Sequence, residues 1–396
     1  MGGYGGDLAA CGLGIAGGVM ITLPGMAEIW ALLPEARMVG GAVRDMLAGR
    51  AVADVDFASP LAPEAVMARA LKAGIKAIPT GLAHGTVTLL AAGRGFEVTT
   101  LRRDIETDGR HARVAFTDDW QEDAARRDFT INAMSCTRAG QVFDYFGGQA
   151  DLASGVVRFV GLPAQRIAED YLRILRFFRF YARYGCSAPE AGTMAAIAAN
   201  AQRVCGLSPE RVWDELKKIL QAPALLGAVQ LMQQSGVLAQ VLPGARFERL
   251  VAFVAKSSPV EPLLRLAALT DEDVAARLRL SGAEARTLAS WRAPLTIGPE
   301  DDEAALRRAL AECPADQLIA RTWLRGDETA AWAGLRARLA LRASPVFPLQ
   351  GRDLLALGVA AGPALGVALA NTRRWWLAGG CVADKAACLA HARGEV

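Results

Sequence analysis

Hydrophobic and polar positions change their spacing at short intervals over residues 26–150. Alternation with a period of two and an abundance of β-branched residues predict strands, whereas apolar spacings of three and four predict helices. The sequence therefore predicts an α/β unit of modest size. We expect strands at 37–39, 52–57, 86–90 and 96–100 and helices at 43–47 and 63–71.

From about residue 160 onward the pattern turns helical almost without interruption. Ala, Leu and Arg dominate, and prolines and glycines separate the helical segments. The pattern predicts an α/β head followed by all-α domains, with a boundary near 150–160. We divide the chain into an extension expected to be disordered (1–25), a head (26–155), a helical neck (156–225), and a helical body and tail (226–396).

Composition is typical of a globular protein with more than one domain. The 396 residues are 52% hydrophobic and 21% charged, which excludes a disordered chain and exceeds what one compact core usually holds. Forty-four basic residues against 41 acidic ones give a net charge of +3. Any binding of nucleic acid therefore depends on local basic surfaces.

Sequence signals for export or membrane insertion are not evident. Glycines interrupt the apolar N-terminal residues, and no Lys or Arg precedes Arg37, unlike the start of a signal peptide. No stretch reaches the roughly 20 uninterrupted apolar residues of a membrane span. The seven cysteines form no C-x-x-C pair. We expect a cytoplasmic protein that has no membrane association and no evident protein partner.

Two aspartates have the spacing that places side chains on one face of the expected strand 52–57. The Cα atoms of Asp54 and Asp56 would lie roughly 7 Å apart. A divalent cation would relieve the repulsion between them, and Mg²⁺ prefers a few carboxylates together with substrate phosphates. Glu97, on the expected strand 96–100, is a candidate third carboxylate. The alternative for these acids is a solvated position on a polar strand.

A glycine pair lies between an expected strand and an expected helix, shortly before the paired aspartates. Gly40 and Gly41 allow the backbone to approach a ligand closely, and a helix start offers free N–H groups to an anion. Arg44 follows one turn later and would reach a phosphate or a ribose. This combination favours a nucleotide or phosphate site.

Arginines recur every third residue in the segment 166–183, which we expect to be one helix. Arg173, Arg176 and Arg179 lie among Ile, Leu, Phe and Tyr residues. Partly buried guanidinium groups need anionic partners, because removing their water costs several kcal/mol each. Structural ion pairs with acidic residues and an anionic ligand are the two explanations that the sequence leaves open.

Asp170 and Arg173 are one turn apart on that expected helix and would share a face. A carboxylate accepts a hydrogen bond from an exocyclic amino group, and a guanidinium donates to ring nitrogens and carbonyls. The pair is therefore able to read the edge of a base without a template. Glu169 would hold Arg173 in place from beside it.

Five motifs follow one another in a fixed order. They are G-G-A-V-R-D-M-L-A-G at 40–49, D-V-D at 54–56, R-R-D-F-T-I-N-A at 126–133, E-D-Y-L-R at 169–173, and E-R-V-W-D-E at 210–215. Together they resemble the class II tRNA nucleotidyltransferases (CCA-adding enzymes) and the related bacterial poly(A) polymerases. The resemblance implies a nucleotidyltransferase head of the DNA polymerase β superfamily, followed by helical neck, body and tail domains.

The resemblance also implies an activity, namely the Mg²⁺-dependent transfer of CMP and AMP from CTP and ATP to the 3′ end of tRNA. Asp54 and Asp56 would carry the metal, and the neck would recognise the nucleotide base. The residues implied in nucleotide binding are Gly41, Arg44, Arg127, Asp170, Arg173, Arg176 and Arg179. The segment 103–114 resembles the loop that helps the switch from C to A addition. Glu210, Arg211 and Glu215 are expected to brace the neck helices.

Several related activities share these motifs. A poly(A) polymerase is the first alternative, which the low net charge mildly disfavours. Enzymes that add only CC or only A remain alternatives because they differ in loop details. Outside enzymes, the alternative is an inactive RNA-binding relative, against which the intact Asp54, Asp56 and Arg127 count.

Overall fold

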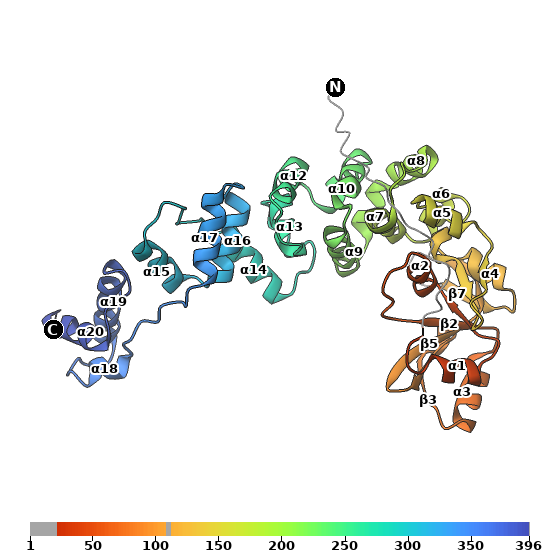
Figure 1. Ribbon diagram of the computed structural model, residues 1–396, viewed down its shortest axis with the longest axis horizontal. Helices are drawn as coiled ribbons and strands as arrows, with labels where there is room; N and C mark the ends of the chain where they lie inside the picture. The colour runs from red at the N-terminus through yellow and green to blue at the C-terminus, as the bar shows by residue number, and fades with distance from the viewer. Residues whose placement is uncertain (1–21, 108–111, 396) are drawn as a thin grey trace. The chain divides into compact units, whose positions relative to one another are not determined.

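The computed structural model describes residues 22–107 and 112–395, which fall into two compact units that divide between Pro243 and Gly244 (Figure 1). Residues 1–21 of the predicted extension lie outside the described residues. Residues 22–25 lead into the first helix, where Gly25 has φ +94°. A Cβ at Gly25 would approach the carbonyl oxygen of Ala91 to 2.7 Å, so this start of the chain fits closely against the head.

A seven-stranded sheet in the order β3-β4-β5-β2-β1-β8-β9 forms the centre of the head (Figure 1). All neighbouring strands are antiparallel except β2 and β5. A separate pair, β6 and β7, flanks residues 108–111, so the middle of the loop predicted at 103–114 lies outside the described residues. The strands are β1 Arg37–Val39, β2 Asp56–Ser59, β3 Lys76–Gly81, β4 Thr86–Ala91, β5 Arg94–Thr100, β6 Arg102–Thr107, β7 Ala112–Phe116, β8 Met134–Cys136 and β9 Val142–Asp144.

The strand expected at 52–57 is shorter and shifted, because β2 begins only at Asp56. The register explains the difference: Val39, the last residue of β1, pairs with Asp56, and the chain then turns into a helix. Residues 52–55 therefore have no partner strand on that side. The alternation of exposed and buried residues nevertheless extends to Asp54, since Val55 and Phe57 are buried.

Helices cover the sheet and continue as the neck. The helix α3 packs on β3 and β4, and α1 packs on β4. Trp30 of α1 also meets Phe57 of β2 edge to face at 5.2 Å. The helices of the first unit are α1 Met26–Leu32, α2 Gly41–Leu47, α3 Pro63–Lys72, α4 Trp120–Ala125, α5 Gly148–Ser154, α6 Pro163–Glu169, α7 Leu172–Tyr184, α8 Ala191–Ala199, α9 Pro209–Gln221, α10 Leu225–Gln234 and α11 Val237–Val241, with short 3₁₀ turns η1 Leu82–His84, η2 Thr130–Asn132 and η3 Ala201–Gly206.

The single helix expected over 166–183 is wrong, because α6 ends at Glu169 and α7 begins at Leu172. Asp170 has an extended backbone (φ −154°, ψ 109°), and its carboxylate accepts a hydrogen bond from the backbone N–H of Leu172 at 3.0 Å. Asp side chains commonly interrupt helices in this way, because they satisfy free N–H groups at a helix start. Asp170 and Arg173 are thus not one turn apart on a continuous helix.

An aromatic cluster joins the head to α7. Phe129 lies 4.7 Å from Phe159 and 5.2 Å from Phe180, measured between ring centroids. Phe177 stacks on Phe159 at 5.9 Å. Aromatic pairs of this kind bury large areas and contribute about 0.5–1.5 kcal/mol each beyond that burial. The cluster therefore fixes the arginine-bearing helix against the motif at 126–133.

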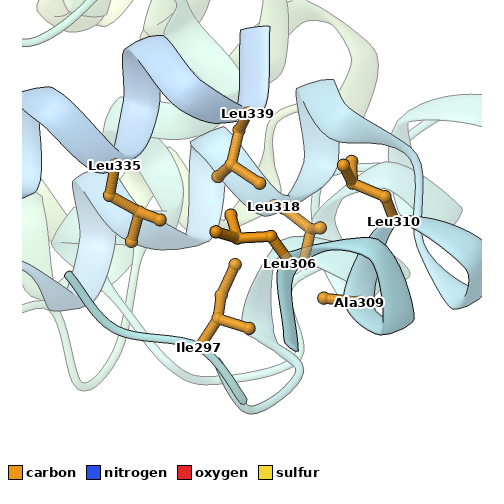
Figure 2. Packing of buried hydrophobic residues seen from close by; sticks show 7 residues of the cluster. All are labelled: Ile297, Leu306, Ala309, Leu310, Leu318, Leu335 and Leu339. Carbon is orange, nitrogen blue, oxygen red and sulfur yellow. The ribbon is translucent and has the colours of Figure 1, made fainter. Parts of the chain in front are cut away.

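The second unit is entirely helical in its described residues. One of its cores gathers leucines from α15, α16 and α17 with Ile297 (Figure 2). None of the described helices of either unit has the length and apolarity needed to cross a membrane. The helices are α12 Phe247–Ala255, α13 Pro262–Leu269, α14 Gly282–Arg292, α15 Glu303–Glu312, α16 Ala315–Arg325, α17 Ala330–Ala340, α18 Gly351–Leu355, α19 Pro363–Ala378 and α20 Lys385–Glu395.

The architecture confirms the predicted fold class, an α/β head followed by helical domains. After β9, the described residues contain no further strand, only an isolated bridge between Phe129 and Phe159. The division into head, neck, and body with tail stays a prediction.

Candidate active site

A cleft of about 490 Å³ is lined by residues from all five sequence motifs, of which the fifth contributes Arg211. Its walls carry seven arginines but only three aspartates, so the cleft favours a ligand with several negative charges. The lining residues are Val39, Gly40, Gly41, Arg44, Asp56, Arg126, Arg127, Asp128, Asn132, Asp170, Leu172, Arg173, Arg176, Arg179, Phe180 and Arg211. All the predicted nucleotide-binding residues are among them; Asp54 and Glu97 are not.

The glycine pair forms the floor between the sheet and α2. Gly40 has φ +64°, a conformation that residues with a side chain rarely adopt. A Cβ at this position would lie 3.1 Å from Nη1 of Arg127. The missing side chain thus lets Arg127 lie directly over the turn, next to Asp56, the partner of Val39 in the sheet.

Of the three predicted carboxylates, Asp56 is the one among the described residues that line this cleft. Asp54 and Asp56 lie on either side of the buried Val55 and both reach solvent, although the surrounding head removes part of the water around the carboxylate of Asp56. Glu97 lies on β5 one residue before the Phe57–Val98 pair, just as Asp56 does on β2. The pKa of Asp56 is raised, first by loss of surrounding water and then by the negative charge of Glu97, while Arg127 opposes the shift and Asp54 adds to it.

These acids fit a divalent cation that also takes ligands from a substrate. The donors are carboxylate oxygens, which suit Mg²⁺. The pKa of Asp56 is raised first by loss of surrounding water and then by like charges, and a cation would offset both effects. The described residues contain no group of three or more His, Cys, Asp or Glu side chains that would hold a metal alone. A metal here would therefore rely on Asp54, Asp56 and substrate phosphates, which is the usual arrangement for Mg²⁺.

Two cleft arginines are connected through the motif at 126–133. Arg44 donates from Nη1 to Oδ1 of Asn132 at 2.6 Å, and Asn132 donates from Nδ2 to Oδ1 of Asp128 at 3.0 Å. Asp128 accepts from Nε of Arg176 through its other oxygen at 2.6 Å. Burial alone would raise the pKa of Asp128, but Arg176 and these hydrogen bonds hold it below its ordinary value.

A second buried acid holds the neighbouring arginines of the same motif. Asp123, on α4, accepts from Nε of Arg126 at 2.8 Å and from Nη2 of Arg127 at 3.1 Å. Burial opposes ionisation of Asp123, yet the two guanidinium groups lower its pKa. Arg126 and Arg127 are thereby aimed from one anchor into the cleft.

The ring of Phe180 separates three guanidinium groups. Arg179, Arg44 and Arg176 lie 4.4, 5.1 and 5.5 Å from its centroid. The aromatic face attracts cations and thus offsets part of their mutual repulsion. Arg179 also pairs with the buried Glu215 at 3.2 Å. Glu215 therefore braces the neck, and the helix arginines combine both explanations left open by the sequence, since they form ion pairs and line the cleft.

The pair expected to read a base also lines the cleft. Arg173 is fixed by Glu169 at 2.5 Å, as expected, and by the carbonyl oxygens of Arg166 and Arg126. Of its five donors, two are left for a ligand among the described contacts. Asp170 pairs with Arg211 at 2.8 Å, so Arg211 also faces the cleft.

Five residues with clear positions in this site were not singled out from the sequence. Arg126, Asp128 and Asn132 lie inside a quoted motif, and their polar character beside apolar neighbours was a usable signal. Asp123 and Phe180 offered no comparable signal, because an acidic residue on an exposed-looking helix and an aromatic among aromatics fit ordinary structural roles.

Comparisons with known proteins found similarity over the head and over most of the chain. Residues 36–158 match the family described as the poly A polymerase head domain, and residues 188–248 match the probable RNA and SrmB-binding site of polymerase A. The mitochondrial CCA tRNA nucleotidyltransferase 1 of Danio rerio is 39% identical over 89% of this chain and 86% of that protein. The CCA-adding enzyme of Geobacillus kaustophilus is 40% identical over 53% of this chain and 51% of that protein.

A solved structure is similar to this chain over almost its whole length. The Bacillus stearothermophilus CCA-adding enzyme in complex with CTP superposes with a TM-score of 0.73 and 27% identity, over 94% of this chain and 98% of that one. The Thermotoga maritima CCA-adding enzyme complexed with tRNA has a TM-score of 0.62 at 22% identity, over 91% of each chain, and supports the fold.

Proposed function

Because this chain belongs to the family of the CCA tRNA nucleotidyltransferases, we propose that it adds CMP and AMP, taken from CTP and ATP, to the 3′ end of tRNA. One observation carries the proposal. A single cleft brings the glycine turn, Asp56, a row of arginines and the Asp170–Arg173 pair together. This combination supplies charge compensation for a triphosphate and polar groups for a base in one site.

Nucleotidyltransferases of this family generally use divalent metal ions, and we propose Mg²⁺ held by Asp54 and Asp56. When bound, the ion would favour ionisation of the primer 3′-hydroxyl and offset charge on the phosphates. Asp54 and Asp56 would hold the ion, and of these two residues Asp56 lines the cleft together with Gly41. Glu97 adds negative charge next to Asp56 and is proposed as a supporting carboxylate.

The arginines are proposed to hold the triphosphate. Arg44, Arg127, Arg176 and Arg179 are positioned by buried or partly buried partners, so their donors are pre-organised rather than free to rotate. Pre-organised charges lower the barrier to phosphoryl transfer, because little reorganisation accompanies the change of charge in the reaction. Gly41 leaves room for the phosphates to approach the backbone.

Asp170 and Arg173 are proposed to select the base. Cytosine and adenine both present an exocyclic amino donor beside a ring-nitrogen acceptor, and uracil and guanine present the reverse order. A carboxylate beside a guanidinium matches the first order and opposes the second. Glu169 and Arg211 would hold this pair in place through their ion pairs.

The helical body and tail, residues 226–396, are proposed to bind tRNA mainly through its phosphates and shape. The cytoplasm stays our prediction for the cellular location. The animal relatives are named as mitochondrial proteins, which makes the mitochondrion the alternative. Imaging the tagged full-length chain in its own cells decides between the two.

The proposal is tested with a tRNA transcript that lacks its 3′-terminal CCA. The purified protein is incubated with Mg²⁺ and each labelled nucleotide separately, and then with CTP and ATP together. We expect two additions with CTP alone and three with both nucleotides, after which extension stops.

Other outcomes identify the alternatives. A long run of A identifies a poly(A) polymerase, a stop after CC or an addition of A alone identifies a partial enzyme, and no addition identifies an inactive RNA-binding relative. The match to a poly A polymerase head domain is the observation that keeps the first of these in the test.

A further inference from the structure

A second cavity, of about 260 Å³, adjoins the nucleotide cleft. It shares Arg44, Arg179 and Phe180 with the cleft and adds Arg183 from α7 and Lys218 from α9. Its remaining lining residues are Gln221, Ala222 and Pro223, so none of the described residues that line it is acidic. We call it the basic cavity.

The basic cavity lies beyond the phosphate end of the cleft. Along α7, Arg173 marks the end that faces the base, and Arg183 lies ten residues later, about 15 Å farther along the helix. Arg44 and Arg179, which we propose to hold phosphates, form the boundary between the two spaces. A phosphate group that leaves the cleft at this end therefore enters the basic cavity directly.

The cations of the basic cavity are less neutralised than those of the cleft. Arg44 has Asp45 as a partner and Arg179 has Glu215. In the described part of the chain, Lys218 has no ion-pair partner. The guanidinium of Arg183 contacts Tyr184, donating from Nε to its hydroxyl at 3.1 Å and lying 5.8 Å from its ring centroid, and pairs with no described acid.

The shared boundary also carries unbalanced positive charge. Burial lowers the pKa of Arg179, and the nearby cations Arg176 and Arg44 lower it further, against the effect of Glu215. An anion between Arg179 and the exposed cations Arg183 and Lys218 would relieve this repulsion. The geometry and the charge therefore point to the same kind of ligand.

We propose that the basic cavity receives the inorganic diphosphate released by nucleotidyl transfer. This inference rests on the proposed function. In that reaction the primer 3′-oxygen bonds to the α-phosphorus, and the bond from the α-phosphorus to the oxygen bridging to the β-phosphorus breaks. The hydroxyl proton passes to solvent, and diphosphate departs with the bridging oxygen. The diphosphate then exchanges its contacts with Arg44 and Arg179 for contacts with Arg183 and Lys218.

The experiment uses inorganic diphosphate as the probe and the double variant Arg183→Ala/Lys218→Ala of the full chain. Isothermal titration without nucleotide or RNA gives the affinity for diphosphate, and the reverse reaction on a CCA-ended tRNA gives its use as a substrate. We expect the affinity for diphosphate and its use in the reverse reaction each to fall roughly tenfold in the double variant. Two exposed cations together contribute about 1–1.5 kcal/mol, and a loss of 1.4 kcal/mol corresponds to a tenfold change.

Lys217→Ala is the matched control, because Lys217 lies next to Lys218 but pairs with Asp214 and does not line the basic cavity. It should leave both quantities unchanged. The two residues of the double variant, Arg183 and Lys218, are exposed, and thermal melting checks that the variant keeps its fold. Equal diphosphate affinity in wild type and double variant would overturn the proposal.

A measurement with tRNA tests whether the basic cavity holds a phosphate of the RNA backbone in place of diphosphate. If the double variant raises the KM for tRNA and leaves diphosphate binding unchanged, the cavity holds an RNA phosphate and the proposal is wrong. The test also separates this inference from the proposed function. A wild-type chain that adds no nucleotide, but binds diphosphate through Arg183 and Lys218, disproves the function and not the site.

Discussion

Arg176 donates a hydrogen bond from Nε to the carboxylate of Asp128 at 2.6 Å, and so links the neck helix α7 to the motif at 126–133 of the head. Through Asn132 the same carboxylate also reaches Arg44 on α2. Three separate segments thus place two arginines in the cleft by means of one buried acid. The alignment of the cleft depends on this acid as much as on the arginines themselves.

Replacing Asp128 with Asn is expected to lower kcat/KM for CTP and ATP about 10- to 100-fold and to destabilise the protein by about 2–3 kcal/mol. The change removes the buried charge that pairs with Arg176 and leaves a partly buried guanidinium without its anionic partner. Urea unfolding and steady-state kinetics measure the two effects. In a double-mutant cycle with Arg176→Gln the losses should not add. Strictly additive losses would show that the two residues act independently.

Stability should fall in acid because of Asp123 and Asp128. Burial alone would raise the pKa of each carboxyl in the folded state. Their arginine partners outweigh this effect and lower both pKa values. A carboxyl with a depressed folded pKa contributes stability above its unfolded pKa of about 3.9 and loses it as pH falls through the folded value. We expect the free energy of unfolding to decline below about pH 4–5, and Asp128→Asn to flatten the decline. A profile that is equally steep in the variant would contradict the linkage.

Asp56→Asn is expected to abolish nucleotide addition while tRNA binding is retained, because Asp56 is one of the two proposed metal ligands. In EDTA the variant should melt slightly above wild type. The pKa of Asp56 is raised by desolvation and by Glu97 and Asp54, so at neutral pH its ionised form costs stability that Asn does not.

Added Mg²⁺ should then raise the melting temperature of wild type but not of Asp56→Asn. Glu64→Gln, which changes an exposed acid on α3, is the control and should respond to Mg²⁺ as wild type does. Wild-type turnover in Asp56→Asn, or the same response to Mg²⁺, would contradict a metal at this position.

The sequence was sufficient for the fold class and for five of the seven arginines that line the cleft, whereas Arg126 and Arg211 were not assigned to it. Arg44, Arg127, Arg173, Arg176 and Arg179 all line it. Their spacing in motifs was informative because a guanidinium group in an apolar segment needs an anionic partner or ligand to offset its loss of water. The strand and helix boundaries around Asp54 and Asp170 were wrong, since they depend on the shortness of β1 and on a local side-chain hydrogen bond.

The partners of these arginines were largely beyond the sequence. Asp123 and Asp128 become anchors only because tertiary packing buries them beside Arg126, Arg127 and Arg176. Spacing and neighbours alone do not distinguish Asp123 from a surface acid, and Asp128 was marked only by its place in the motif at 126–133. Glu169 was the exception, because it lies four residues before Arg173 and local spacing was enough to pair them.

Phe180→Leu should raise the KM for both CTP and ATP about three- to thirtyfold with a smaller effect on kcat. The ring lies among Arg44, Arg176 and Arg179, and each cation–π contact contributes about 0.5–1 kcal/mol. Phe178→Leu is the matched control, since Phe178 is also buried on α7 but does not line the cleft. Equal KM values in the two variants would show that packing alone accounts for the effect.

Base selection by Asp170 and Arg173 is tested most directly by the nucleotide selectivity of Arg173→Ala and Asp170→Ala on a tRNA that lacks its CCA end. Relative kcat/KM for CTP, ATP, UTP and GTP is determined for each variant and for wild type. The account predicts that wild type rejects UTP and GTP and that both variants lose at least tenfold of this discrimination. Variants that are slower but as selective as wild type would contradict base selection by this pair.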